Sequence, residues 1–339
     1  MQRSGASSVD RELRGGRFMR QRSRFTDRVT ADGSTAYRAE PGRYHLYVAR
    51  ACPWSQRTLI VRHLKGLEDV IGVSYAHPFR DERGWAFSGP DDAAGHGTDA
   101  NTGTHVPGRK PTGGGFTDDL HGWEFLSEAY RASDANFRGR ITVPVLWDRE
   151  TGRIVNNDSA HIVRMLNSAW DEWGDASVDL YPEPLRAEID ATNEWVYDQF
   201  NNGVYRAGFA TSQAAYDDAF ADVFSALERL EAILAERRYL TGDALTEADW
   251  RAWVTLLRFD PVYYTHFRLN GRRIADQPNL WGYTRELYQL PGIAETTSID
   301  EIKTHYYTTH DQLNPKRIIP RGPLDWDLTA PHGRTTPRG

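Results

Sequence analysis

Cysteine occurs only once among the 339 residues, at Cys52. A lone cysteine excludes an internal disulfide and fits a reducing compartment, so we expect a cytoplasmic protein. The chain also has no second thiol that could resolve a disulfide formed at Cys52. Any redox cycle through Cys52 must therefore take its second thiol from another molecule, most simply a small soluble thiol.

Several other features are missing, and each excludes a class of protein. No apolar run approaches the length of a transmembrane helix, and the polar, Arg-rich N-terminus lacks the apolar core of a secretory signal. A net charge of -6 gives no electrostatic basis for binding nucleic acid or an anionic membrane. The eleven histidines show no HExxH or paired Cys/His spacing, so we expect no metal site. A G-x-S-x-G elbow is also missing, which argues against a serine hydrolase.

The stretch around Cys52 predicts a strand that leads into a helix. Tyr44–Val48 has β-branched and aromatic residues in near-alternation, which is typical of a strand. Pro53 suits the first turn of a helix, and apolar residues then recur at helical spacing to about Lys65. Cys52 thus lies at a helix N-terminus, where free N–H groups and the helix dipole favour a thiolate. We expect a nucleophile, and the alternative is a buried structural cysteine.

The following residues continue an α/β pattern. Val70–Tyr75 predicts a second strand, so that strand, helix and strand form a βαβ unit. A long Gly-, Asp- and Pro-rich loop over 81–116 contains Trp85, which is either a hydrophobic plug or a stacking face for a ligand. A helix is then expected from Leu120 to about Ala132.

Two strands and a helix complete this first domain. The first strand, Ile141–Asp148, contains Pro144, either as an ordinary edge-strand proline or in a cis bond that turns the Val143 backbone toward a peptide-like ligand. Arg153–Asn157 is the second. Asp158 and Ser159 then begin a helix over 160–167, where they act as N-capping residues and are also suited to bind a carboxylate or an α-amino acid head group.

Four regions follow from these patterns. Residues 1–40 predict an irregular extension in which Phe18, Phe25 and Tyr37 are possible anchors, and 41–170 predict the α/β domain. Residues 170–184 are rich in Gly, Pro and acidic residues and predict a linker. Residues 185–314 predict an all-α domain in which Thr246–Asp249 forms a capping box, and 315–339 predict an irregular tail. The helices of the all-α domain are expected at 185–201, 213–237, 247–259, 278–290 and 299–306.

The order of these elements resembles that of glutathione transferases, which have a thioredoxin-like N-terminal domain followed by a C-terminal helical bundle. Longer stretches resemble one class, the glutathionyl-hydroquinone reductases or xi class. They are 43–47 with Cys52-Pro53-Trp54, 142–148, 154–157, 201–210, and 302–307 with Asn314-Pro315. The resemblance covers roughly residues 18–323.

The resemblance implies a function and a set of site residues. The family reduces S-glutathionyl hydroquinones: a cysteine takes the glutathionyl sulfur and releases the hydroquinone, and a second glutathione resolves the mixed disulfide. Cys52 is then the nucleophile. Trp85, Val143, Asp158 and Ser159 would hold glutathione. Tyr197, Tyr263 and Tyr306 would line the quinone pocket and help to protonate the leaving carbon. The resemblance also implies a homodimer and no permanently bound cofactor.

Some details depart from the pattern of the class. Ser55 stands where alanine is usual, Asp158 stands where glutamate is common, and the segment from about Asp91 to Gly115 is longer than usual. Only four of the 41 basic residues are lysines, which suggests a GC-rich coding genome, and some such organisms use thiols other than glutathione. The co-substrate is therefore glutathione or another low-molecular-weight thiol.

Two other functions remain open. A glutaredoxin-like deglutathionylase would use the same Cys52, but it would not need the three tyrosines. A transferase-like interaction module without catalysis would not need a cysteine at the helix start.

Overall fold

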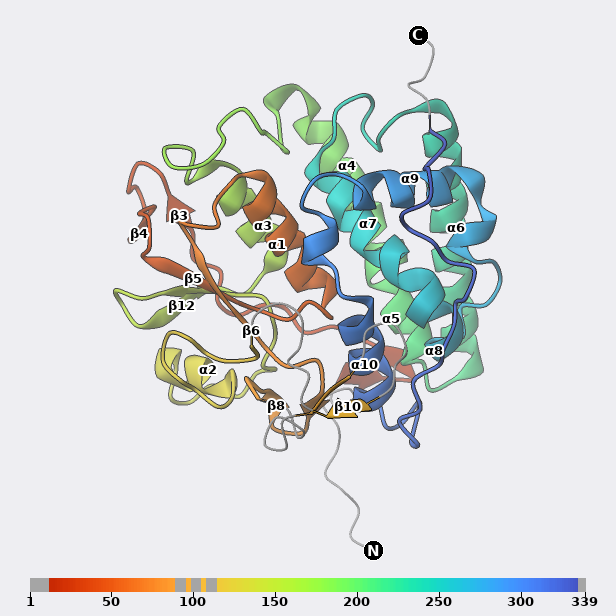
Figure 1. The fold of residues 1–339 in the computed structure, drawn as a ribbon, viewed down its shortest axis with the longest axis horizontal. Helices are drawn as coiled ribbons and strands as arrows, with labels where there is room; N and C mark the ends of the chain where they lie inside the picture. Colours follow the sequence, from red (N-terminus) through yellow and green to blue (C-terminus); the bar gives the residue numbers. More distant parts are fainter. Residues whose placement is uncertain (1–11, 89–95, 99–104, 108–114, 335–339) are drawn as a thin grey trace, which may run out of the picture. The chain divides into compact units, whose positions relative to one another are not determined.

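The structure of the chain is a computed structural model that describes residues 12–88, 96–98, 105–107 and 115–334 (Figure 1). The chain divides into two compact units, each of which is built from separate segments. The sheet unit comprises Ser23–Val178 and Thr296–Arg321. The helical unit comprises Met1–Arg22, Asp179–Glu295 and Gly322–Gly339.

A four-stranded sheet in the order β12-β11-β5-β6 forms the centre of the sheet unit. The inner strand β5 (Tyr44–Val48) runs parallel to β6 (Gly72–Tyr75) and antiparallel to β11 (Val145–Asp148), which pairs with β12 (Arg153–Asn156). All five residues of β5 are buried, as expected for an inner strand covered on both faces. The predicted strands around Cys52 are thus confirmed.

Helices cover both faces of this sheet. The helices α1 (Pro53–Leu64) and α3 (Ser159–Ser168) pack against each other on one face, and α2 (Ser127–Ser133) lies on the other (Figure 1). The crossover from β5 through α1 to the parallel β6 is the predicted βαβ unit. This arrangement places the C-terminal end of β5 and the N-terminus of α1 next to each other, with Cys52 at their junction.

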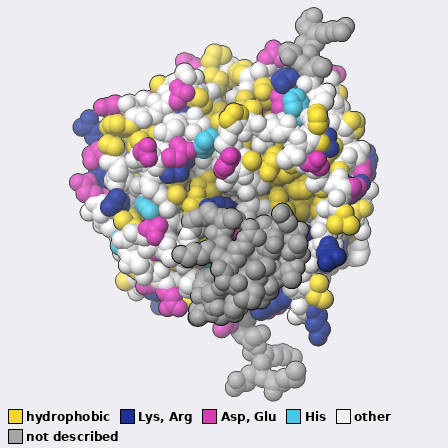
Figure 2. Space-filling view, in the orientation of Figure 1, with side chains coloured by type: hydrophobic (Ala, Val, Ile, Leu, Met, Phe, Trp, Pro, Cys, Tyr) yellow, Lys and Arg dark blue, Asp and Glu magenta, His cyan; other side chains and the backbone are white. Residues whose placement is uncertain are grey.

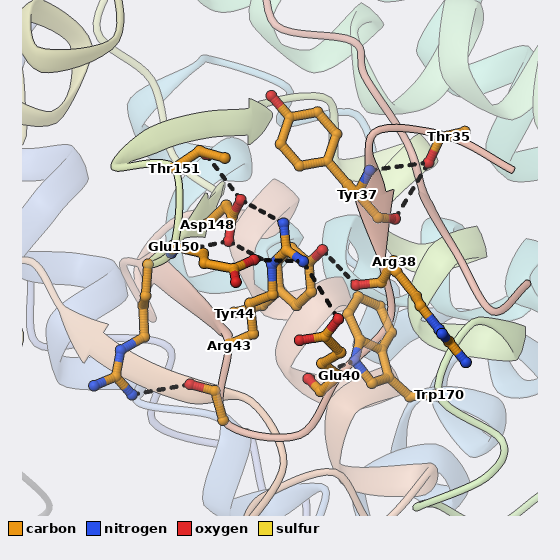
Figure 3. Close-up of polar contacts among 12 residues, drawn as sticks. Thr35, Tyr37, Arg38, Glu40, Arg43, Tyr44, Asp148, Glu150, Thr151 and Trp170 are labelled. Atoms are coloured by element: carbon orange, nitrogen blue, oxygen red, sulfur yellow. Dashed lines mark hydrogen bonds and ion pairs between the residues drawn. The ribbon is translucent and has the colours of Figure 1, made fainter. Parts of the chain in front are cut away.

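An ion pair holds the start of β5 against the end of β11 (Figure 3). Nε and Nη2 of Arg43 donate to the two carboxylate oxygens of Asp148 at 2.8 and 2.9 Å. Burial alone would raise the pKa of Asp148, but hydrogen bonds from Arg43 and Thr151 outweigh burial and hold that pKa below its ordinary value. Because Asp148 is fully buried, this pair is a strong constraint on how the two strands meet.

Between β6 and β11 the sequence predicted a helix over 120–132, and the predicted start of this helix was wrong. The helix α2 begins only at Ser127, and the residues before it form turns. The buried carboxylate of Asp118 accepts the backbone N–H groups of Leu120, His121 and Trp123, each at 3.1 Å. An aspartate that satisfies local N–H groups favours turns over a helix.

Short strands replace part of the expected loop over 81–116. The strand β7 (Arg80–Asp81) pairs with β8 (Gly84–Trp85), and β9 (His96–Thr98) pairs with β10 (His105–Pro107). Much of the Gly/Asp-rich segment from Asp91 to Gly115 lies outside the described residues.

Helix α10 (Ile299–Thr309) belongs to the sheet unit, where it contacts β7. The sequence instead placed these residues in an all-α domain over 185–314. The difference arises because helical periodicity shows that a helix buries one face, but not which part of the chain covers that face. Tyr306 therefore shares a compact unit with Cys52.

The helical unit contains α4 (Arg186–Trp195), α5 (Gly203–Gly208), α6 (Gln213–Glu236), α7 (Glu247–Arg258), α8 (Tyr264–His266) and α9 (Pro278–Tyr288). Two π-helical turns interrupt the helices, η4 (Val196–Asn201) and η5 (Phe259–Tyr263). The predicted capping box of α7 is confirmed, because Asp249 accepts the backbone N–H of Thr246 at 2.9 Å.

The N-terminal extension is more regular than expected. The strands β1 (Leu13–Arg14) and β2 (Arg17–Phe18) form one pair, and β3 (Val29–Thr30) and β4 (Tyr37–Arg38) form another. Phe18 packs on Phe209 in the helical unit, and Phe25 stacks on Phe137 in the sheet unit. Both therefore act as the predicted anchors, each in a different unit.

Among the described residues, no helix combines the length and apolar character that crossing a membrane requires. Acidic and basic side chains are interspersed on the face shown in Figure 2.

Candidate active site

Cys52 is the N-cap residue of α1, as predicted. Its backbone is extended (φ -84°, ψ 123°), and its carbonyl accepts the first helical hydrogen bond from Gln56 N at 2.9 Å. Its own N–H donates to Ala49 O at 3.0 Å, and the Ala49 N–H donates to Ser55 Oγ at 3.3 Å. The turn that carries the thiol is therefore held at both ends by hydrogen bonds, and Cys52 is buried, with 8% of the residue exposed.

Val143 faces the thiol from the neighbouring strand. Cys52 Sγ lies 3.7 Å from the carbonyl oxygen of Val143. The Val143–Pro144 peptide bond is cis, which was one of the two alternatives for this proline, and β11 begins only after it. The structure thus brings together Cys52 and Val143, which are 91 positions apart in the chain. That the Val143 backbone pairs with a ligand stays a prediction.

Trp85 belongs to the same buried apolar cluster as Cys52 and Val143. Its indole stacks on the imidazole of His305 in α10, with ring centroids 4.7 Å apart and planes 18° from parallel. The guanidinium of Arg80 lies 5.6 Å from the indole centroid. With 4% of the residue exposed, this packing agrees with the alternative of a hydrophobic plug, and a stacking role toward a ligand stays a prediction.

Asp158 and Ser159 begin α3. Asp158 is the N-cap residue, and its Oδ1 accepts the N–H of Ala160 at 2.8 Å, which confirms the capping role predicted for it. Ser159 is the first residue of the helix and is 6% exposed. Its hydroxyl oxygen accepts hydrogen bonds from Arg57 of α1. No local pattern pointed to Arg57, because its contact with Ser159 joins residues 102 positions apart.

Two further contacts, which sequence reasoning missed, tie the start of α10 to the Cys52 turn. Arg50, two residues before Cys52, donates from Nη1 to Glu301 Oε1 at 3.2 Å. Gln56, four residues after Cys52, donates to Thr297 Oγ1 at 2.8 Å. Burial raises the pKa of Glu301 even though Arg50 opposes the shift. The position of the thiol therefore depends on a segment that follows it by some 245 residues.

Tyr306 lies on α10 beside His305 and is 1% exposed. Its ring contacts the imidazole of His310 at a centroid distance of 5.6 Å. Nδ1 of His305 lies 2.7 Å from the carbonyl oxygen of Pro78. Because a carbonyl oxygen only accepts, Nδ1 carries the proton and donates to it. Through His305 and Trp85, Tyr306 is linked to the cluster that contains Cys52.

Tyr197 and Tyr263 lie in the helical unit, each on a π-helical turn. Such turns are frequent at functional sites. Tyr197 is 42% exposed, whereas Tyr263 is fully buried and stacks on Phe267 at 5.4 Å. The roles of all three tyrosines in a quinone pocket stay predictions.

No group of three or more His, Cys, Asp or Glu side chains among the described residues is arranged to hold a metal ion.

Comparisons with known proteins match both parts of the chain. The family model described as "Glutathione S-transferase, N-terminal domain" matches residues 51–169, and "Glutathione S-transferase, C-terminal domain" matches residues 213–286. The glutathionyl-hydroquinone reductase YqjG of Escherichia coli is 50% identical over 331 residues, which span 96% of this chain and 94% of that protein. The chain belongs to the glutathione transferase family, in its xi class.

Other relatives of this class agree. The glutathionyl-hydroquinone reductase PcpF of Sphingobium chlorophenolicum is 44% identical over 93% of this chain and 92% of its own length. The glutathione-bound structure of YqjG superposes with a TM-score of 0.82 at 49% identity, covering 92% of this chain and 96% of that one. The xi transferase of Phanerochaete chrysosporium gives a TM-score of 0.82 at 44% identity, with 91% and 98% coverage. The glutathione transferase fold, thioredoxin-like followed by all-α, is therefore confirmed.

Proposed function

We propose that this xi-class glutathione transferase is a glutathionyl-hydroquinone reductase that uses glutathione or a related small thiol, with Cys52 as its nucleophile. The observation that carries the proposal is the place of Cys52: its thiol lies at the N-terminus of α1, 3.7 Å from the Val143 carbonyl. The similarity to two reductases of this activity over more than nine-tenths of the chain supports it.

The reaction proceeds in two steps, each an attack of a thiolate on sulfur. The Cys52 thiolate attacks the sulfur of the S-glutathionyl hydroquinone, an S–S bond forms, and the C–S bond breaks. The electron pair of that bond goes to the ring carbon, which takes up a proton and leaves as hydroquinone. A glutathione thiolate then attacks the mixed disulfide, which releases glutathione disulfide and regenerates Cys52. The second thiol comes from solution because Cys52 is the only cysteine of the chain.

Four residues are suited to hold the glutathione part of the substrate. The Val143 carbonyl lies beside Sγ of Cys52, where it can accept a hydrogen bond from a peptide N–H of the tripeptide. Asp158 and Ser159 at the start of α3 suit the two charges of the glutamyl head group, with the carboxylate on the helix N-terminus and the ammonium near Asp158. Trp85 contributes an apolar wall within the same cluster.

Tyr197, Tyr263 and Tyr306 are the candidates for acids. A phenol donates a hydrogen bond, and one placed near the leaving ring can stabilise its oxygen or supply the proton. A glutaredoxin-like exchange needs no such acid, because its leaving group is a thiolate.

Mass spectrometry of the intact protein tests the role of Cys52. Incubation with glutathione disulfide is expected to add one glutathionyl group to the wild type and none to Cys52→Ser. Turnover of an S-glutathionyl hydroquinone should be lost in both Cys52→Ser and Cys52→Ala, because no other thiol is present. Retained turnover in either variant would place the chemistry elsewhere.

The same experiment identifies the thiol. Incubation with disulfides of other small thiols in parallel shows which adduct forms fastest on Cys52. A homodimer in the cytoplasm is part of the proposal, and analytical ultracentrifugation of the full chain checks the oligomeric state.

A further inference from the structure

Arg57 and Ser159 meet where α1 and α3 pack together. Nε and Nη2 of Arg57 both donate to the hydroxyl oxygen of Ser159, at 3.0 and 2.6 Å. Arg57 is 3% exposed and Ser159 is 6% exposed. A buried guanidinium is costly unless its donors are satisfied and its charge serves a partner. The Arg57 guanidinium also lies 4.9 Å from the centroid of the Trp54 ring, so the tryptophan shares in stabilising its charge. What the forked pair of hydrogen bonds adds is a fixed orientation of the Ser159 hydroxyl.

The two hydrogen bonds restrict what the Ser159 hydroxyl can do. A serine oxygen has two lone pairs and one hydrogen. Arg57 occupies both lone pairs, so the hydrogen of the hydroxyl points away from the guanidinium. Within the part of the chain that the structure describes, that hydrogen has no acceptor. Arg57 thus makes Ser159 a hydrogen-bond donor that is available to a ligand.

The surroundings of Ser159 favour an anionic acceptor. Ser159 is the first residue of the ten-residue helix α3, so the positive end of the helix dipole lies here. Asp158 has its Oδ1 engaged by the N–H of Ala160. The fixed positive charge of Arg57 adds to the dipole directly behind the hydroxyl. A carboxylate that approaches the start of α3 therefore meets a donor that is already oriented and backed by a cation.

We propose that Arg57 is a positioning residue that holds the Ser159 hydroxyl as a donor to the glutamyl carboxylate of glutathione. The inference rests on the proposed function, because that function places glutathione at the start of α3. Arg57 does not touch the ligand, and its effect passes through Ser159. The consequence is selectivity for a small thiol that carries an α-carboxylate at this end.

Calorimetric titration of the full chain with two thiols tests the inference. One is glutathione, and the other is 4-aminobutyryl-cysteinyl-glycine, which lacks only the glutamyl α-carboxylate. The wild type should bind glutathione more tightly than the analogue. In Arg57→Met, glutathione should bind about tenfold more weakly, whereas the analogue should bind as it does to the wild type, because only the carboxylate uses the oriented hydroxyl.

Three further variants separate positioning from packing. Ser159→Ala should show the same loss as Arg57→Met, and the double variant should lose no more than either, because the two residues act as a unit. Arg57→Lys should recover part of the affinity, since an ammonium can donate to the hydroxyl but lacks the forked geometry. Arg62→Met is the matched control on α1, because Arg62 donates to the carbonyls of Ile71 and Glu68 and not to Ser159.

The outcomes are distinct. Equal weakening of both thiols in Arg57→Met, or additive losses in the double variant, would show a structural tie between α1 and α3 and overturn the inference. Where Arg57→Met does not fold, Arg57→Lys and Ser159→Ala decide by the same comparison of the two thiols. A wild type that binds neither thiol would instead contradict the proposed function. If every Arg57 variant still binds glutathione more tightly than 4-aminobutyryl-cysteinyl-glycine by the wild-type ratio, only the role of Arg57 is contradicted.

Discussion

The indole of Trp85 and the imidazole of His305 lie face to face, 4.7 Å between ring centroids, and this stack joins the Cys52 cluster to α10. His305 is held in turn by the carbonyl of Pro78 at 2.7 Å. One histidine thus orders both the tryptophan and the helix that carries Tyr306.

His305 variants should separate stacking from hydrogen bonding. His305→Ala removes both interactions and should lower the free energy of unfolding by about 2 kcal/mol, whereas His305→Phe keeps a stacking ring and should lower it by about 1 kcal/mol. Urea unfolding measures both. His63→Ala is the control, because its contact with Glu68 is on the surface. Equal losses in the two His305 variants would show that the ring stack contributes nothing.

Loss of a tyrosine hydroxyl from the proposed quinone pocket should slow the turnover of a hydroquinone conjugate more than that of a simple mixed disulfide. Phenylalanine at Tyr197, Tyr263 or Tyr306 should lower kcat for an S-glutathionyl hydroquinone, by about 10²-fold where the phenol supplies the proton. Reduction of a simple mixed disulfide should change less, because its leaving thiolate needs no acid. Tyr216→Phe is the control, since that hydroxyl donates to the carbonyl of Arg268. Equal losses on both substrates, or none on the conjugate, would favour the glutaredoxin-like alternative.

Arg43 should contribute most to the free energy of unfolding at neutral pH. Arg43→Met leaves the buried carboxylate of Asp148 without its cation and should lower the free energy of unfolding by about 3 kcal/mol. The lowered pKa of Asp148 means that the pair stabilises the fold above about pH 4 and loses this effect as the pH falls and Asp148 takes up a proton. The difference between variant and wild type should therefore shrink in acid.

The control for Arg43 is a pair of the same chemistry on the surface. Arg83 also donates to an aspartate, Asp81, but 62% of its side chain is exposed. Arg83→Met should leave the free energy of unfolding nearly unchanged at any pH, because solvent screens an exposed pair. Unfolding measured by urea at pH 7 and at a pH well below 4 checks both variants, and a loss for Arg43→Met that is the same at the two pH values would contradict the role given to Asp148.

Asp260 should make the fold less stable as the pH rises. Burial raises its pKa to about 6, although the carboxylate accepts the N–H groups of Ile274 and Ala275. The folded state therefore binds this proton more tightly than the unfolded chain, and its contribution is lost as the pH rises from about 4 to about 6. The loss amounts to about 3 kcal/mol for a shift of this size.

Asp260→Asn removes that titration. Stability curves of the variant should lack the part of the pH dependence between pH 4 and 6 that Asp260 contributes, while the exposed Asp217→Asn should follow the wild type. Thermal unfolding across this pH range measures the effect. Parallel curves for wild type and Asp260→Asn would mean that Asp260 does not titrate there.

The sequence predicted the local features of the candidate site well. Strand β5, the position of Cys52 at the start of α1 and the Asp158 cap all follow from residues that are near neighbours in the chain. Such features depend on backbone preferences and on hydrogen bonds within a few residues, which a pattern records. For Pro144 the sequence left two alternatives open, and the structure shows the cis bond.

The features that were missed depend on contacts between distant segments. Arg57 reaches Ser159 across 102 positions, and Arg50 reaches Glu301 across 251. The π-helical turns at Tyr197 and Tyr263 span only six and five residues, and such short i→i+5 segments carry no apolar pattern of their own from which they could be predicted. The assignment of α10 failed for the same reason, because its partners lie on β7 and β8.

The return of the chain to the sheet unit has a consequence for biosynthesis. The sheet, α1 and α3 are complete by Val178, but Thr296–Arg321 belongs to the same unit. A ribosome must therefore make nearly the whole polypeptide before the thiol-bearing turn gains its contacts with Thr297 and Glu301. Domains usually fold in the order of their synthesis. Here the N-terminal fold becomes final only after the helices that follow it have emerged.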